Sequence, residues 1–176
     1  MKRFGLILSV VALSFTLHTQ ATAKTTAETL STNNAITLAA DGSEHFWNAL
    51  HGSKDNSCTP RTFDYKDADY VYLCEEFDTK EKLSNYLNET FTNGSIEQGL
   101  KDYDYMTYNG KLAHPVGDGF SMLDWDHATA KLVKKQGSTR TFEFTVPTVD
   151  GDSVKRHVTF ASVGSQWKIT TFDAVQ

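Results

Sequence analysis

The sequence predicts an α+β fold in which N-terminal helices pack on a C-terminal four-strand antiparallel meander, with an additional small hairpin region. Apolar residues recur at helical spacing only before about residue 101, which places the helices in the N-terminal part. In the C-terminal third apolar residues alternate with polar ones between regular turn signals, which indicates strands. Helices that precede an antiparallel sheet pack on one of its faces, so this order of elements indicates an α+β domain.

The N-terminus has the pattern of a secretory signal peptide, residues 1–23. Lys2 and Arg3 precede an apolar run, and Ala21-Thr22-Ala23 matches the small-x-small pattern that signal peptidase recognises. The apolar run is shorter than the roughly 20 residues of a membrane span, and an uncleaved anchor is the alternative. We therefore expect a secreted protein that begins near Lys24 and has no contact with the membrane after cleavage.

One domain is expected after the signal segment. Residues 24–34 are rich in threonine, alanine and asparagine and are predicted to form a flexible leader. Residues 35–176 then form a single domain that can fold without a metal or cofactor.

The chain is acidic. It has 17 Lys and Arg against 22 Asp and Glu, a net charge of −5, and loss of the signal segment removes two of the positive charges. Nucleic-acid binders need a basic face, so this balance argues against nucleic acid as a partner. It favours a basic partner, or it serves solubility alone.

Three helices are expected before the meander. The first is best marked from Ser43, with apolar residues on one side, and Gly52 ends it. The second begins at a capping-box pattern with Asp78 as N-cap, and Asn93-Gly94 ends it. The third is short and runs from a cap at Ser95 to about residue 101.

Short strands are expected between and after these helices. Alternating aromatic residues predict two strands joined across residues 66–69, and Asn109-Gly110 predicts a hairpin turn. A loop is expected over residues 113–119. The four strands of the meander are expected at residues 130–135, 140–148, 153–161 and 167–171.

The chain contains two cysteines, Cys58 and Cys74. In the oxidising surroundings of a secreted protein two cysteines suggest one disulfide, which would add about 3 kcal/mol of stability. Two unlinked thiols are the alternative.

Motifs that carry catalysis or hold metals are missing from the sequence. The histidines have no metal-ligand spacing, and there is no Gly-x-Ser-x-Gly elbow or phosphate-binding glycine loop. Asp67 and Asp69 alternate as in a calcium loop, but the glycine and the distal glutamate that complete such a loop are missing. We therefore expect a protein that is not an enzyme and that uses no cofactor and no metal.

Clustered aspartates are the first candidate for binding. They fall in two segments, represented by Asp67 and Asp69 and by Asp102 and Asp104. Like charges in close sequence repel one another, which favours a basic partner. The alternative is a solvated hairpin edge whose charges prevent edge-to-edge pairing.

A loop with two glycines is the second candidate. It consists of Gly117, Asp118, Gly119 and Phe120. Glycines on both sides of Asp118 let the backbone approach a partner closely, and Phe120 could anchor the contact. The alternative is an ordinary connection between two strands.

Several short motifs follow one another in a fixed order along the chain. They are Phe-Trp at 46–47, Tyr-Val-Tyr-Leu at 70–73, Phe-Asp-Thr-Lys-Glu-Lys-Leu-Ser-Asn-Tyr-Leu at 77–87, Asn-Gly-Lys-Leu-Ala at 109–113, Gly-Asp-Gly at 117–119, the region of Trp125, and Gln-Trp-Lys-Ile at 166–169. In order and spacing they resemble the IseA family of secreted inhibitors of D,L-endopeptidases, over nearly the whole predicted mature chain. The cysteine pair is not part of this resemblance.

The resemblance implies a cystatin-like fold and a non-catalytic, acidic protein. Family members dock on the positively charged groove of NlpC/P60-type cysteine peptidases, the autolysins that cut peptidoglycan, and block it with a glycine-containing loop. In this chain that loop would be Gly117, Asp118 and Gly119. The protein would then be a monomer, extracellular or associated with the cell wall, that restrains peptidoglycan cleavage and cell separation.

An extracellular NTF2-like domain is the alternative function. Such a domain would bind a small molecule, or act as an enzyme, in a cavity between its helix and its curved sheet. The residues that could line the cavity are Tyr103, Tyr105, Trp125 and His127.

Overall fold

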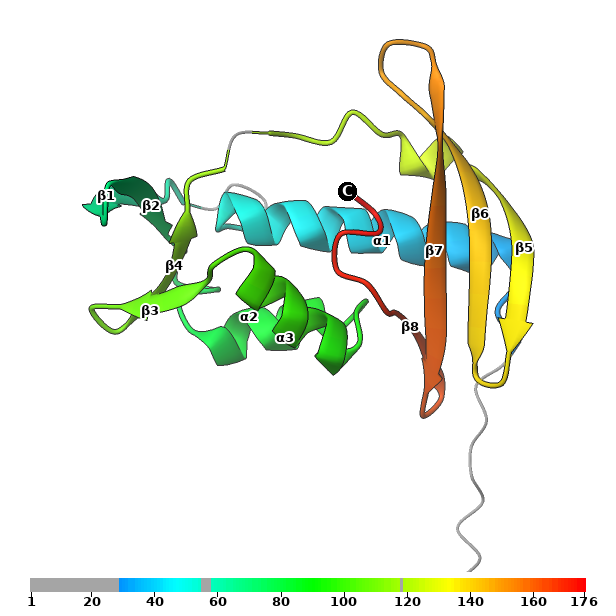
Figure 1. Ribbon diagram of the computed structural model, residues 1–176, viewed down its shortest axis with the longest axis horizontal. Helices are drawn as coiled ribbons and strands as arrows, with labels where there is room; N and C mark the ends of the chain where they lie inside the picture. Colours follow the sequence, from blue (N-terminus) through cyan, green and yellow to red (C-terminus); the bar gives the residue numbers. More distant parts are fainter. Residues whose placement is uncertain (1–28, 55–57, 118) are drawn as a thin grey trace, which may run out of the picture.

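The computed structural model describes residues 29–54, 58–117 and 119–176. It contains three α-helices, one short 3-10 helix and two four-stranded antiparallel sheets in its described part, which confirms the predicted α+β fold (Figure 1). The predicted signal peptide, residues 24–28 of the predicted leader, and Asp118 lie outside the described residues.

Helix α1 (Thr32–His51) is the central element of the domain and starts earlier than the sequence predicts. Ser31 is its N-cap and accepts a hydrogen bond from the backbone N–H of Asn34, so residues 32–34 of the predicted leader are helical. The buried face of the N-terminal half consists of small residues, including Ala35 and Ala39. Small side chains form a weak apolar pattern, which is why the sequence marks only the half that begins at Ser43.

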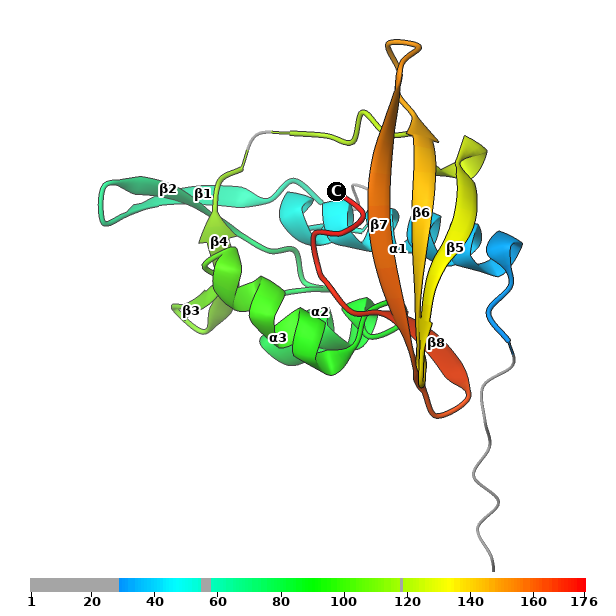
Figure 2. The same cartoon turned by 45° about the vertical axis from the view of Figure 1, so that its right-hand side comes forward.

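The C-terminal sheet is the predicted meander. Its strands follow the order β5-β6-β7-β8, and each pairs antiparallel with the next. The strands are β5 (Thr129–Gln136), β6 (Thr139–Pro147), β7 (Ser153–Val163) and β8 (Gln166–Ile169). Phe142, Phe144 and Phe160 are almost fully buried and belong to the core cluster that includes α1. Helix α1 crosses this sheet in both views (Figures 1 and 2).

The second sheet joins the two predicted hairpins into one unit. Its order is β1-β2-β4-β3, because β2 pairs antiparallel with β4. The strands are β1 (Arg61–Tyr65), β2 (Ala68–Tyr72), β3 (Met106–Tyr108) and β4 (Lys111–Pro115). The predicted loop over 113–119 was therefore wrong at its start, because residues 113–115 pair with β2.

Two short helices, α2 (Lys80–Leu87) and α3 (Asn93–Asp102), connect β2 to β3, and their caps differ from the predicted ones. Thr79, not Asp78, caps α2 by accepting from the N–H of Lys82, while the Asp78 carboxylate pairs with the Lys82 ammonium at 2.8 Å. Thr92 caps α3, so that Asn93-Gly94 begins this helix and does not end the previous one.

A disulfide links Cys58 to Cys74, as the sequence predicts. It ties the segment before β1 to the segment after β2, and the two Cα atoms lie 6.1 Å apart. No helix in the described part of the chain is long and apolar enough to cross a bilayer.

Candidate functional site

The segment that follows β4 forms the candidate site, and it crosses from one sheet to the other along one edge of the domain (Figures 1 and 2). Of the predicted loop, the structure describes Gly117, Gly119 and Phe120. We call these three residues, together with Val116, the glycine loop. Phe120 is 69% exposed and Val116 is 44% exposed, so the loop presents apolar side chains to solvent.

Hydrogen bonds hold the glycine loop at both ends. The N–H of Val116 donates to the carbonyl of Asp69 in β2, with 2.8 Å between N and O. At the other end, Nε2 of His51 lies 3.2 Å from the carbonyl oxygen of Gly119 and donates to it. Gly119 has a φ of +154°, and a Cβ atom at this position would lie 3.4 Å from the ring of Trp47. The loop therefore has a defined conformation at residue 119 that suits glycine.

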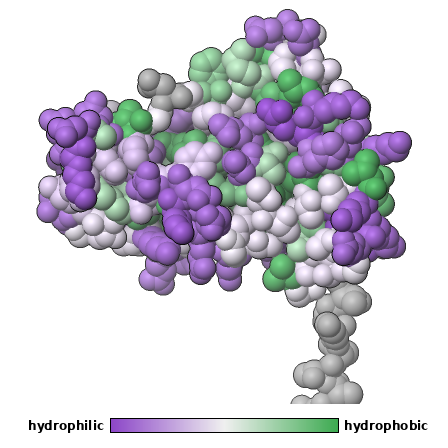
Figure 3. Space-filling model, in the orientation of Figure 1, coloured by the Kyte–Doolittle hydropathy of each residue, from purple (hydrophilic) through white to green (hydrophobic). Residues whose placement is uncertain are grey.

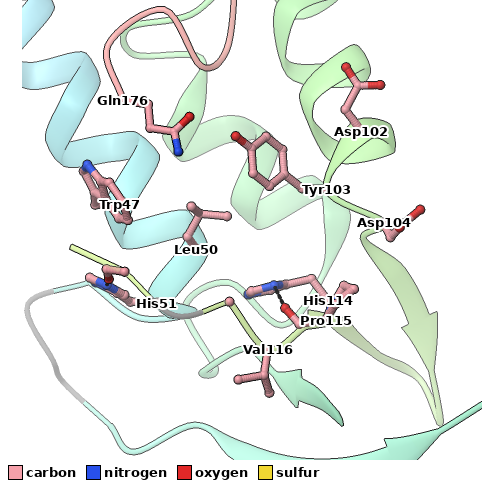
Figure 4. Close-up of a pocket in the computed structure, with 12 residues that line it drawn as sticks. Trp47, Leu50, His51, Asp102, Tyr103, Asp104, His114, Pro115, Val116 and Gln176 are labelled. Carbon is pink, nitrogen blue, oxygen red and sulfur yellow. Dashed lines mark hydrogen bonds between the residues drawn. The ribbon is translucent and has the colours of Figure 1, made fainter. Parts of the chain in front are cut away.

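A cavity of about 320 Å³ lies beside the glycine loop (Figure 4). It brings together two predicted groups that are distant in the sequence, the loop glycines and the aspartates at 102 and 104. Its lining comes from the end of α1, the end of α3, β4, the loop and the C-terminus: Trp47, Leu50, His51, Asp102, Tyr103, Asp104, His114, Pro115, Val116, Gly117, Gly119 and Gln176.

Asp102 and Asp104 form the outer rim of the cavity lining, and their carboxylates point outward from it (Figure 4). Asp102 is the last residue of α3 and accepts a 2.6 Å hydrogen bond from Nε2 of Gln98. Asp104 has a φ of +51° in the connection to β3. Both are exposed, and Tyr103 between them is half-buried. Burial raises the pKa of Tyr103, and the carboxylates of Asp173 and Asp102 add to the shift.

The other predicted pair, Asp67 and Asp69, does not line this cavity. Asp67 lies in the β1–β2 turn with a φ of +62°, and Asp69 is directly opposite Asp64 in the strand register. Like charges in this arrangement are destabilising. Hydrophilic side chains gather over this end of the molecule (Figure 3). The pair thus forms a separate acidic edge, connected to the loop through the Asp69 carbonyl.

Sequence reasoning missed the buried histidine of the cavity. His114 is only 2% exposed and packs against the ring of Tyr105, with 4.7 Å between ring centroids. Its Nδ1–H donates to the carbonyl of Pro115 at 2.7 Å, whereas its Nε2 is buried without a hydrogen-bond partner among the described residues. Burial lowers the pKa of His114, and the carbonyls of Pro115 and Leu50 oppose that shift.

His51 was also missed, although it is the last residue of a predicted helix. Only the fold reveals that its ring reaches the Gly119 carbonyl, which is 68 residues further along the chain. Its place in the final helical turn, just before Gly52, was the one local signal, because side chains at helix ends often bind nearby carbonyl groups.

The residues proposed to line an NTF2-like cavity do not line one cavity. Tyr103 contributes to the cavity beside the glycine loop. The hydroxyl of Tyr105 donates to the carbonyl of Ala49, and the Trp125 indole N–H donates to a carbonyl of the C-terminal segment, so both pack in the interior. His127 is exposed and pairs with Asp124 at 2.9 Å. The described residues contain no group of three or more His, Cys, Asp or Glu that could hold a metal ion.

Comparison with known proteins identifies the family of this chain. The family model described as IseA DL-endopeptidase inhibitor matches residues 26–174. The uncharacterized protein YoeB of Bacillus subtilis (strain 168) is similar to this chain, with 47% identity over 180 residues that cover 99% of each chain. The chain therefore belongs to the IseA DL-endopeptidase inhibitor family.

Proposed function

We propose that the protein inhibits cell-wall D,L-endopeptidases of the NlpC/P60 type by placing the glycine loop in the basic groove that binds their substrate. The observation that carries this proposal is the exposed glycine loop, whose apolar side chains project while hydrogen bonds to His51 and Asp69 hold its backbone. A loop that is ordered before binding loses less conformational entropy on binding than a flexible one. Inhibition of this kind requires only that the groove be occupied, so no catalytic group is needed.

Charge supports the same proposal. Asp102 and Asp104 lie beside the loop, and Asp67 and Asp69 form a second acidic edge connected to it. Acidic residues around a binding loop speed the encounter with a basic groove, and added salt weakens this effect. We propose that these aspartates, together with Asp118 in the loop, face basic residues around the groove of the peptidase.

The biological setting follows from the partner. A peptidase that cuts peptidoglycan works outside the cytoplasmic membrane, where a disulfide such as Cys58–Cys74 is stable. We propose that the protein is secreted, acts as a monomer at the cell wall, and restrains peptidoglycan cleavage and cell separation.

The test is an inhibition assay with the secreted form and a purified D,L-endopeptidase of the cell wall. Peptidoglycan hydrolysis should fall in proportion to added inhibitor until the two proteins are about equimolar. The double substitution Gly117→Pro with Gly119→Pro should abolish inhibition, because proline fixes φ near −65°, far from the +154° that residue 119 adopts in the ordered loop. Full inhibition by this variant, with its fold intact by circular dichroism, would show that the loop does not block the groove.

Phe120 offers a second test. Removal of a projecting aromatic anchor at an interface costs more than about 1 kcal/mol, so Phe120→Ala should raise Ki by about tenfold. The matched control is Leu132→Ala, which removes a 43% exposed side chain from β5. This control should leave Ki unchanged. Equal effects of the two substitutions would contradict a specific role of Phe120.

A further inference from the structure

We propose that the cavity beside the glycine loop binds one basic side chain of the peptidase, an arginine or a lysine, when the loop enters the groove (Figure 4). This inference rests on the proposed function, because the partner is the same enzyme. It assigns to the cavity a ligand of defined chemistry, a group that brings N–H donors and a positive charge.

His114 lines the cavity, and its ring carries a buried hydrogen-bond acceptor without a donor among the described residues. The Nδ1–H of His114 is used by the carbonyl of Pro115, so in the neutral ring Nε2 carries a lone pair. Burial lowers the pKa of His114, which favours the neutral ring. The side chain is 2% exposed, and Nε2 has no partner among the described residues. A buried acceptor without a donor is costly, so a ligand that supplies an N–H is favoured here.

The rim of the cavity adds negative charge. Asp102 and Asp104 are among the lining residues, with carboxylates that point outward from the cavity (Figure 4), and the described lining contains no lysine or arginine that could neutralise them. No ion pair joins either carboxylate to a basic side chain elsewhere in the described ranges. A cationic ligand therefore gains an attraction at the rim that a neutral one lacks.

The walls of the cavity suit the stem of a long side chain. Trp47, Leu50 and Val116 supply apolar surface to the lining. A volume of about 320 Å³ lies at the small end of the range for ligand pockets, which fits a side chain better than a larger molecule. Arginine and lysine both pair an apolar stem with a cationic head. Arginine suits the cavity better, because its five N–H donors can reach several acceptors at once.

The location of the cavity connects it to the peptidase. Val116, Gly117 and Gly119 belong both to the glycine loop and to the cavity lining. When the loop occupies the groove of the peptidase, a basic residue at the edge of that groove would lie next to the opening of the inhibitor's cavity. Once the loop is in the groove, the basic side chain is held close to the cavity. Its binding there would then add to the affinity of the complex without a second encounter between the two proteins.

The first experiment uses the free inhibitor and follows the imidazole nitrogens of His114 by NMR. The probe is Nα-acetyl-arginine amide, and the control probe is Nα-acetyl-citrulline amide, which has a similar shape but no charge. The arginine probe should shift the Nε2 resonance of His114 in a saturable way, and the citrulline probe should bind at least several-fold more weakly. No shift with the arginine probe, or equal shifts with both probes, would overturn the proposal.

The second experiment compares aspartate variants. Asp104→Asn should weaken the arginine probe about two- to fivefold, as expected for an exposed charge pair, and Asp102→Asn together with Asp104→Asn about tenfold. Asparagine tolerates the positive φ of residue 104. The control, Asp150→Asn, makes the same charge change at the exposed β6–β7 turn and should have no effect. An equal effect of Asp104→Asn and Asp150→Asn would refute the role of the rim.

The peptidase assay separates this inference from the proposed function. Asp104→Asn should raise Ki by about two- to fivefold more than Asp150→Asn does. If the wild type inhibits fully and Asp104→Asn does so equally well, the cavity proposal fails and the proposed function stands. If the arginine probe binds but the wild type does not inhibit, the proposed function fails and the cavity remains a site for basic groups.

Discussion

Replacement of Gly119 by alanine should weaken inhibition and leave the domain folded. The φ of Gly119 is +154°, a value that side chains other than hydrogen rarely allow. Its carbonyl accepts the hydrogen bond from His51 that holds the end of the glycine loop. Alanine should therefore push the loop away from the conformation that we propose is the inhibitory one.

The expected rise in Ki for Gly119→Ala comes from backbone strain more than from side-chain packing. An added Cβ would lie 3.4 Å from the Trp47 ring, which is close to ordinary contact. A residue in a sparsely populated backbone region costs about 1–3 kcal/mol. Since about 1.4 kcal/mol corresponds to a factor of ten, Ki for Gly119→Ala should rise by about five- to 150-fold.

Gly94→Ala is the control outside the loop. The φ of Gly94 lies outside the positive region, and nothing lies within 4 Å of its Cβ position. The assay measures Ki against a cell-wall D,L-endopeptidase and Tm for the wild type, Gly94→Ala and Gly119→Ala. Gly94→Ala should match the wild type within about twofold. A Gly119→Ala variant with wild-type Ki would refute the reasoning, because the observed backbone at residue 119 would then be irrelevant to binding.

Three further predictions concern stability. Replacement of Cys58 and Cys74 by serine opens a link across a sequence separation of 16 and should lower the free energy of unfolding by about 3 kcal/mol in urea titrations. Gly99→Ala places a Cβ atom 2.3 Å from a phenylalanine ring and should cost about 1–3 kcal/mol by the same measurement, whereas Gly94→Ala, in open space on the same helix, should cost nothing. Burial lowers the pKa of His114 below its ordinary value of 6.5, so the unfolded state binds more protons as pH falls below 6.5. The free energy of unfolding should therefore decrease from pH 7 to pH 5, and His114→Phe should show a smaller decrease.

The meander could be predicted from the sequence because its signals are local. Phe142 and Phe144 alternate with polar residues along one strand, and a turn with glycine follows each of the first three strands. Each strand pairs with its neighbour in sequence, so no long-range information is needed. Similarly, two cysteines allow only one pairing, and the secretory pattern supplies the reason to expect it.

The second sheet could not be predicted in full. Tyr70 pairs with Pro115 and Tyr72 with Ala113, partners that lie 115 − 70 = 45 and 113 − 72 = 41 residues apart in the sequence, and no local pattern reports such a partner. For the same reason the sequence identified the glycine loop and Asp102 and Asp104 as separate features without placing them at one cavity.

The histidines show why part of the site was missed. In the sequence His114 is one of several isolated histidines, and only its packing against Tyr105 and its 2% exposure distinguish it. Burial is a property of the tertiary structure, so the lowered pKa and the unpaired Nε2 have no counterpart in the local sequence.

The most direct test of the account is a cross-link from Phe120 to the peptidase. A photoreactive benzoyl-phenylalanine at position 120 would project from the glycine loop, because the native side chain is 69% exposed. A second probe at Leu132, which is 43% exposed on β5, serves as the control. The account predicts cross-links from position 120 to the peptides that line the catalytic groove, and none from position 132. Cross-links from position 120 to a surface remote from the groove, in a complex that is fully inhibited, would contradict it.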